Sequence, residues 1–282
     1  MLSFRAGLDI IRPVNCAMIG LAVTVGEFVS RPPQIPIGQS VLGFLAGFFL
    51  CAYSMAANDI YDVEVDRVNQ PSRPIPSARI STQNANRLSV LGLMIGMACS
   101  VLSFNPLAVT IAAAYAFLSW LYSYRAKREG IGGNLIVASS LAIPFVYGGV
   151  ISGGKILSSL LLLMALTAFF AGVGREVVKA MADIEGDEKR GVNSLARRRG
   201  MKAASVAGAA SFILAVFTSW LPLVYKLANE FYVFGVLVPD VIFVYLAVSI
   251  AEDQSISNAH RVKTVALAGM LAGLLVFIGG GV

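Results

Sequence analysis

The sequence predicts an all-α integral membrane protein with nine transmembrane helices. Of its 282 residues, 57% are hydrophobic and only 13% are charged, whereas a soluble domain is about a quarter charged. The apolar residues gather in nine stretches of roughly twenty residues, the length that crosses a bilayer as a helix. Two clusters of acidic residues each follow one of these stretches. We therefore expect one polytopic membrane domain over residues 1–282, without a soluble module.

Prolines, glycines and charged residues separate the expected spans. A polar, interfacial lead occupies residues 1–12, and Pro13 begins the first span. Three prolines prevent the connection after the second span, about 59–86, from forming one continuous helix. Ser81 then provides an N-cap before the third span, and Gly148 in the fifth span predicts close helix packing. The expected spans are about 14–29, 38–57, 88–104, 107–124, 131–151, 156–178, 203–223, 232–250 and 265 to the C-terminus.

The basic residues predict the orientation. With the N-terminus in the cytoplasm, 19 of the 22 Lys and Arg lie in inner segments, and only Arg31, Lys155 and Lys226 lie in outer ones. This distribution follows the positive-inside rule, so the net charge of +6 needs no nucleic-acid partner. It puts both acid clusters, and the long connections after the second and sixth spans, on the cytoplasmic side. We expect these connections to cap a central cavity between two related halves, about 1–130 and 131–282.

The first acid cluster follows the second span directly. Asn58, Asp62 and Asp66 are four residues apart and share one face if the segment is helical. With Asp59, they form an oxygen-rich group of the kind that suits Mg²⁺, which binds one or two carboxylates together with the phosphate oxygens of a substrate. The alternative is an acidic helix end in solvent. The basic residues just behind this cluster are Arg67 and Arg73.

The second acid cluster follows the sixth span. Arg175, Lys179, Asp183 and Asp187 are each four residues apart, so one helical face would carry two cations and then two carboxylates. One interpretation is a row of salt bridges along the helix, worth only ~0.3–0.5 kcal/mol per pair. The other is the second half of a shared metal–phosphate site. The presence of two acid clusters, each closing an apolar stretch, favours the shared site.

These two motifs resemble the two aspartate-rich motifs of the UbiA superfamily of intramembrane prenyltransferases. Their spacing, their order and their position after apolar helices all agree, and the resemblance covers nearly the whole chain. The chain departs from the family pattern at Ala180, where related archaeal members often carry an acid, and we assign that position no role. Two further stretches look like family features, namely Arg73-Pro74-Ile75-Pro76 and Tyr122-Ser123-Tyr124-Arg125-Ala126-Lys127.

The resemblance and the residue chemistry together give a candidate site for an isoprenyl diphosphate. The expected Mg²⁺ ligands are Asn58, Asp59, Asp62, Asp66, Asp183 and Asp187. The expected catalytic residues are Asp62, Asp66, Asp183, Asp187 and Lys127. The expected substrate-binding residues are Asn58, Arg67, Arg73, Tyr122, Arg175, Lys179 and Asn15, the last of which is otherwise a helix–helix contact. Aromatic candidates for the cavity wall, for which packing alone is the commoner role, are Tyr53, Tyr115, Tyr122, Phe145 and Tyr147.

The resemblance also indicates the reaction. The short chain and its opening from Arg12 to Asn15 look most like archaeal members that transfer geranylgeranyl from its diphosphate to geranylgeranylglyceryl phosphate in membrane ether-lipid synthesis. An aromatic acceptor such as 4-hydroxybenzoate, for quinone synthesis, is the alternative. An ion-coupled transporter is more distant, because the acids lie at the ends of spans and not at their centres. Nothing marks the three cysteines or His260 as ligands or catalysts, and no protein partner is evident.

Overall fold

The computed structural model describes residues 4–30, 37–153, 158–189 and 191–280, and these residues form helices without any strand. The long helices are α2 (Pro13–Val29), α3 (Ile37–Tyr61), α5 (Thr82–Leu102), α6 (Pro106–Tyr124), α7 (Ile131–Ile151), α8 (Ser159–Ala182), α11 (Met201–Val224), α12 (Glu230–Glu252) and α13 (Ile256–Gly280). The short helices are α1 (Phe4–Ile11), α4 (Val63–Asn69), η1 (Ala126–Glu129), α9 (Ile184–Lys189) and α10 (Leu195–Arg199).

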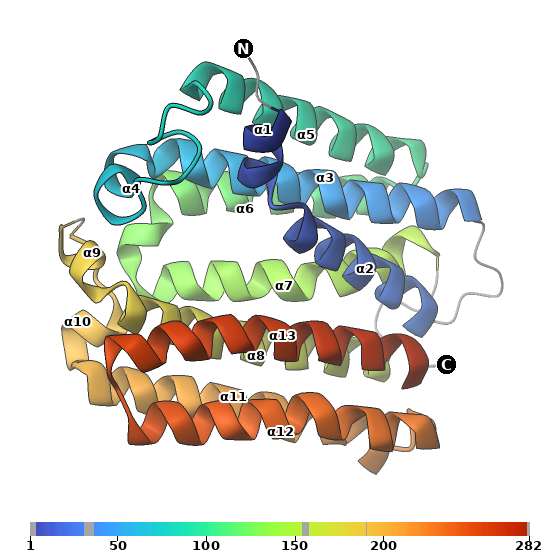
Figure 1. Cartoon of the computed structure of the whole chain (residues 1–282). Coiled ribbons are helices and arrows are strands. Elements are labelled where there is room, and N and C mark those ends of the chain that lie inside the picture. Colours follow the sequence, from blue (N-terminus) through green and yellow to red (C-terminus); the bar gives the residue numbers. More distant parts are fainter. Residues whose placement is uncertain (1–3, 31–36, 154–157, 190, 281–282) are drawn as a thin grey trace.

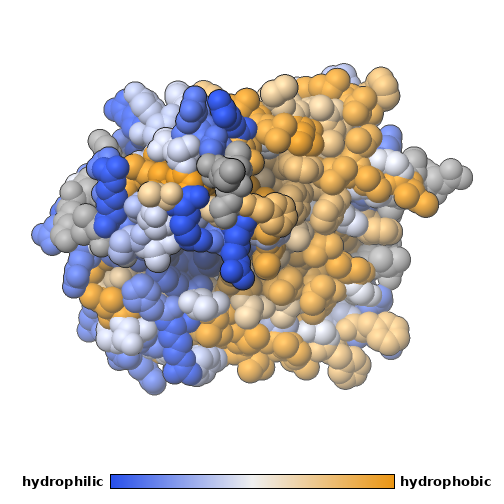
Figure 2. Space-filling model, turned by 45° about the horizontal axis from the view of Figure 1, so that its top comes forward, coloured by the Kyte–Doolittle hydropathy of each residue, from blue (hydrophilic) through white to orange (hydrophobic). Residues whose placement is uncertain are grey.

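The helices are those of a multi-pass membrane protein. Within the described ranges, eight helices are long and apolar enough to cross a bilayer. Helices α1 and α2 bend by 48° at Arg12 and make a ninth crossing when the pair is counted as one span. In Figure 2, hydrophilic residues gather over one end of the molecule and a broad hydrophobic surface covers much of the rest. The predicted all-α membrane class is confirmed, with eight or nine spans.

Most predicted span boundaries agree with the helices, and the last one is wrong. The ninth span was expected from about residue 265, but α13 begins at Ile256. Ser255 caps it, because its Oγ accepts a hydrogen bond from the backbone N–H of Asn258 at 3.2 Å. The polar residues Asn258, His260 and Arg261 therefore form the first turns of the helix and not a loop. The predicted cap at Ser81 is confirmed, since its Oγ accepts from the Asn84 N–H.

The long helices form two groups with α2 and α7 between them (Figure 1). In the first group α3 packs on α5 and α6, and in the second α8 packs on α11 and α13. A large buried cluster of aliphatic and aromatic side chains fills each group, and a third joins α2, α7, α8, α12 and α13. Helices α4, α9 and α10, which follow α3 and α8, lie at one end of the bundle (Figure 1). This arrangement brings the two acid clusters to the same end.

Helices α2 and α7 touch backbone to backbone through glycine. A Cβ atom on Gly26 would lie 2.9 Å from the Phe145 Cα, and a Cβ atom on Gly148 would lie 2.9 Å from the Glu27 N. Both separations are shorter than side-chain carbons tolerate. The predicted close packing at Gly148 is thus confirmed, and it follows the rule that small residues let membrane helices approach.

We expect Gly148→Ala to lower the thermal stability of the protein in detergent, because the new methyl group must push α2 away from α7. Overpacking of this kind destabilises by about 1–3 kcal/mol, so the unfolding midpoint falls by several degrees. Gly38→Ala is the matched control, since a Cβ atom at Gly38 on α3 meets nothing within 4 Å. Equal midpoints for the two variants would contradict the close contact.

Candidate active site

The first acid motif lies where α3 ends and α4 begins. Asp62 stands at the break, yet the backbone bonds continue across it: the Asp62 N–H donates to the Asn58 carbonyl at 3.0 Å, and the Asp66 N–H donates to the Asp62 carbonyl at 2.8 Å. The Asn58 side-chain amide also donates to the Asp62 carboxylate at 3.0 Å. Asn58 and Asp62 therefore share one face, as predicted, although the helix is interrupted.

Two arginines hold the acids of this motif. The Arg73 guanidinium lies 2.5 Å from the Asp66 carboxylate and 3.3 Å from that of Asp59. The Arg12 guanidinium, at the bend between α1 and α2, lies 2.5 Å from the same Asp59 carboxylate. Asp59, Asp62 and Asp66 are all buried, with 3%, 6% and 1% of their surface exposed. The alternative of an acidic helix end in solvent is therefore wrong.

Three predicted residues lie elsewhere or are only partly described. Arg67 pairs with Glu64 at 3.0 Å on the exposed side of α4, so it lies apart from the buried aspartates of the motif. Asn15 is half-buried near the start of α2, close in sequence to Arg12. Lys127 belongs to η1, but its side chain lies outside the described part of the structure.

The second acid motif repeats the backbone pattern of the first. Helix α8 ends at Ala182 and α9 begins at Ile184, with Asp183 at the break. The Asp183 N–H donates to the Lys179 carbonyl at 3.0 Å, and the Asp187 N–H donates to the Asp183 carbonyl at 2.9 Å. Asp187 is buried, and Asp183 remains about one-third exposed.

The cations of the second motif do not form the predicted row of salt bridges along the helix. Arg175 and Lys179 both pair with Glu176, at 2.9 and 3.0 Å. Glu176 is 3% exposed, so two cations surround one buried carboxylate. Asp183 pairs with Lys263 on α13 at 3.1 Å. The interpretation as i,i+4 salt bridges is therefore wrong for Asp183.

Tyr122 lies within electrostatic range of charged residues from both motifs. It lies near the end of α6, where its side chain interacts electrostatically with Lys179 and Glu176 of the second motif and with Asp62 of the first. Asp187 is also within electrostatic range of the Tyr122 hydroxyl group. The sequence-predicted residues Asn58, Asp59, Asp62, Asp66, Arg73, Tyr122, Arg175, Lys179, Asp183 and Asp187 thus lie around one end of the bundle.

The donor set of this site fits a hard cation. Carboxylate and amide oxygens are the ligands that Mg²⁺ prefers, and both motifs supply them. Among the described residues, no three acidic, histidine or cysteine side chains lie together as a ready metal centre. The reason is visible in the ion pairs: the guanidinium groups of Arg12 and Arg73, and the ammonium group of Lys263, hold the carboxylates. Positively charged side chains thus already pair with Asp59, Asp66 and Asp183.

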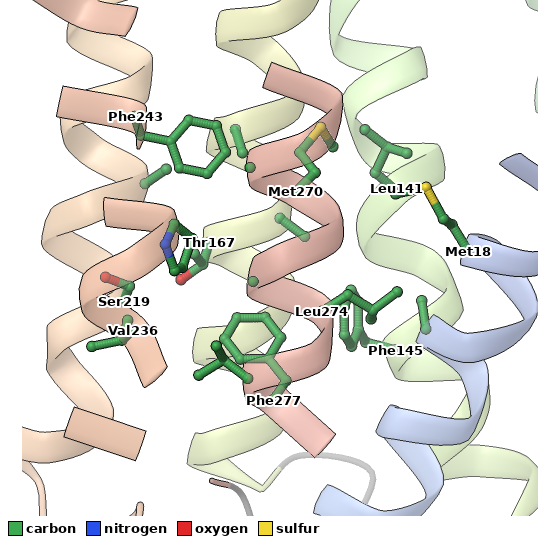
Figure 3. A pocket seen from close by; sticks show the side chains of 18 of the residues that line it. Met18, Leu141, Phe145, Thr167, Ser219, Val236, Phe243, Met270, Leu274 and Phe277 are labelled. Atoms are coloured by element: carbon green, nitrogen blue, oxygen red, sulfur yellow. The ribbon is translucent and has the colours of Figure 1, made fainter. Parts of the chain in front are cut away.

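A cavity of about 720 Å³, its open mouth included, lies among α2, α7, α8, α11, α12 and α13 (Figure 3). Its lining is almost entirely apolar, and the exceptions include Ser219, whose hydroxyl donates to Asp240 at 3.0 Å. Of the aromatic candidates for a cavity wall, Phe145 lines this cavity, and Tyr115 and Tyr147 line a smaller one. Along α8, Asp183 is twelve residues beyond the lining residue Ala171, or about 18 Å at the helical rise. The large apolar side chains in the lining include those of Met18, Leu141, Phe243, Met270 and Phe277.

Sequence reasoning missed four residues at the site. Arg12 and Lys263 bind acids that are 47 and 80 positions away in the chain, and neither lies beside an acid in sequence that would indicate this. Arg197 closes the turn after α9 by donating to the carbonyl of Val192 at 2.6 Å. Glu176 had a local signal, since it lies one and three positions from the two cations that it binds.

Comparison with known proteins agrees with this geometry. The profile of the UbiA prenyltransferase family matches residues 19–277. The chain is 33% identical to the digeranylgeranylglyceryl phosphate synthase of Methanocaldococcus jannaschii, over all of this chain and 98% of that protein. A solved structure of a digeranylgeranylglyceryl phosphate synthase superposes with a TM-score of 0.77 at 32% identity, covering 100% of this chain and 99% of the other. A UbiA homologue of Archaeoglobus fulgidus, bound to DMAPP and Mg²⁺, superposes with a TM-score of 0.68 at 19% identity, covering 96% and 98%.

Proposed function

Since the chain belongs to the UbiA prenyltransferase family, we propose that it transfers a geranylgeranyl group from geranylgeranyl diphosphate to geranylgeranylglyceryl phosphate and releases diphosphate. The reaction depends on Mg²⁺ and makes a membrane ether lipid. The chain is 33% identical over its whole length to a digeranylgeranylglyceryl phosphate synthase, and the function of this relative supports the acceptor. The observation that carries the proposal is that charged residues of both acid motifs lie within electrostatic range of Tyr122, at one end of an apolar helix bundle that contains a cavity.

In this proposal the acidic residues bind the metal and the basic residues bind the phosphate groups. Asn58, Asp59, Asp62 and Asp66 from one side, and Asp183 and Asp187 from the other, would hold Mg²⁺ together with the diphosphate oxygens. When bound, Mg²⁺ neutralises the charge that grows on the leaving diphosphate. Arg73 and Arg175 can donate two parallel hydrogen bonds to phosphate oxygens, whereas Lys127 and Lys179 act as point charges.

The transfer itself is a substitution at the allylic carbon. An oxygen–carbon bond forms between the acceptor hydroxyl and C1 of the prenyl chain, the bond from C1 to the diphosphate oxygen breaks, and diphosphate leaves with the electron pair. The hydroxyl proton passes to the departing diphosphate. Positive charge on the allylic carbon needs shelter from water and a wall of apolar or aromatic groups. Tyr122, which lies at the acid end of the bundle, can supply part of that wall, and the prenyl tail enters from lipid without crossing water.

We further propose that the site faces the cytoplasm and that the two halves of the chain are related. Charge bias along the sequence supports the orientation. The repeated backbone pattern at Asp62 and Asp183 supports the relation between the halves, about 1–130 and 131–282. The segments that hold α4, α9 and α10 would close over the bound substrates and exclude water.

The test is a transfer assay on purified protein in detergent with labelled geranylgeranyl diphosphate. Parallel reactions contain geranylgeranylglyceryl phosphate or 4-hydroxybenzoate, each with Mg²⁺ or with a chelator. We expect Mg²⁺-dependent product with the glyceryl phosphate alone. Product with only the aromatic acid would support prenyl transfer but show that the acceptor is aromatic. The absence of product in every reaction would contradict the proposal.

A further inference from the structure

Lys263 lies on the side of α13 that lines the cavity. Lys263, Met270 and Phe277 are seven residues apart, which is two helical turns, so their side chains leave the helix in nearly the same direction. Met270 and Phe277 both line the cavity and mark its two ends along α13 in Figure 3. Lys263 therefore continues this row by about 10 Å toward the acid motifs.

The ammonium group of Lys263 stands between the cavity and the second motif. It lies 3.1 Å from the Asp183 carboxylate, and the two side chains are 20% and 35% exposed. Both groups are thus in contact with each other and partly accessible to a ligand. An apolar cavity with a cation near one end matches a ligand that has a hydrocarbon tail and an anionic head.

Four other described cations of the site have partners of their own. Arg12 and Arg73 bind the acids of the first motif, and Arg175 and Lys179 bind Glu176. Lys263 alone among these five comes from α13, which packs against both α2 and α8. It is therefore placed to contact a second anionic group, separate from one held by the first motif.

We propose that Lys263 binds the phosphate group of the acceptor lipid, whose hydrocarbon tail occupies the cavity; the assignment rests on the proposed function and names the acceptor subsite within it. A phosphate monoester replaces Asp183 as the partner of the ammonium group and leaves that carboxylate available to a metal ion. Arg175, one turn from the lining residue Ala171, adds a donor, because its buried Nε has no hydrogen-bond partner in the described structure. The acceptor headgroup then lies beside the second motif, within reach of the diphosphate.

Steady-state kinetics of Lys263→Met test this assignment. Loss of a charge-assisted contact to phosphate corresponds to a rise of about tenfold to a hundredfold in the KM for geranylgeranylglyceryl phosphate. The KM for geranylgeranyl diphosphate stays within about twofold of the wild-type value. Lys263→Arg restores most of the acceptor affinity because it restores the positive charge. The Lys263→Met variant also loses the wild-type preference for the phosphorylated acceptor over geranylgeranylglycerol, which has the same tail without the phosphate.

Arg261→Gln is the matched control. Arg261 lies on the same helix two positions away, is exposed, and stacks its guanidinium 5.7 Å from the centre of the Tyr245 ring. It carries the same charge but points away from the cavity row, so its loss leaves the KM for the acceptor unchanged. Thermal unfolding in detergent, with and without geranylgeranylglyceryl phosphate, gives a second readout in which Lys263→Met loses the stabilisation by the acceptor.

The assignment is overturned if Lys263→Met keeps the wild-type KM for the acceptor, or if the KM values for both substrates rise equally. An equal rise would mean that Lys263 acts only by holding Asp183. Absence of product with the wild-type protein contradicts the proposed function instead, so the two failures are distinguishable.

Discussion

Asp62→Asn and Asp183→Asn each abolish prenyl transfer and leave a folded protein in the membrane. Asparagine has the shape of aspartate but no charge, so it cannot neutralise a cation. The hydrogen bonds within the protein survive, because the new amide oxygens still accept from the Asn58 amide and from Lys263, as the native carboxylates do at 3.0 and 3.1 Å. Removal of a single preorganised electrostatic contact costs about 10²–10³ in kcat, and we expect losses at the upper end or beyond.

Activity and stability are measured on the same preparations. The transfer assay gives the loss of rate, and the unfolding midpoint in detergent reports whether the fold is retained. Asp9→Asn is the matched control, because Asp9 pairs with Arg79 on the exposed surface at the same end of the molecule. Its activity stays at the wild-type level. Full activity in both Asp62→Asn and Asp183→Asn would remove the two motifs from the metal site.

The spans could be predicted because membrane insertion depends on local composition. Each long helix carries its own apolar stretch, and hydropathy alone finds it. The predicted boundary was wrong where polar residues continue a helix beyond its apolar stretch, as at the start of α13. There, Ser255 and Asn258 form the cap that starts the helix, whereas an average over twenty residues detects only the apolar residues that follow.

The acids of the site could also be predicted, because their spacing is a local property. Their partners could not. The pairing of Lys263 with Asp183 depends on α8 lying against α13, and the pairing of Arg12 with Asp59 depends on the bend between α1 and α2. The contact of α8 with α13 has no sequence pattern of its own, and although Pro13 marks the break between α1 and α2, nothing in the sequence places Arg12 beside Asp59. Glu176 is a different case. It lies one and three positions from Arg175 and Lys179, so the sequence allowed these pairs. The sequence equally allowed pairs of the same cations with aspartates four residues away.

The ion pairs of the site predict how Mg²⁺ and diphosphate bind together. Before Mg²⁺ can use the carboxylates of the first motif, it must displace the guanidinium groups of Arg12 and Arg73. The displaced cations then need an anion, and the diphosphate supplies it. Each ligand therefore binds weakly alone and strengthens the other, and by thermodynamic linkage the strengthening is mutual.

We expect this coupling to appear in thermal unfolding as well as in catalysis. A chelator abolishes transfer. In the unfolding experiment, Mg²⁺ alone and geranylgeranyl diphosphate with chelator each raise the midpoint slightly, whereas both together raise it by more than the sum, since ligand stabilisation grows with the logarithm of concentration over Kd. Couplings of this kind are about 1–3 kcal/mol, or roughly five- to 150-fold in Kd.

Arg73→Gln separates this explanation from a simple requirement for metal. With Arg73 removed, the Asp66 carboxylate loses the guanidinium partner at 2.5 Å, so Mg²⁺ alone binds more tightly and stabilises the variant more than the wild type. The same variant transfers more slowly, because a donor to the diphosphate is lost. If Mg²⁺ alone stabilised the wild type as much as both ligands together, the carboxylates would already be open to the metal, and the arginines would have no part in coupling the two ligands.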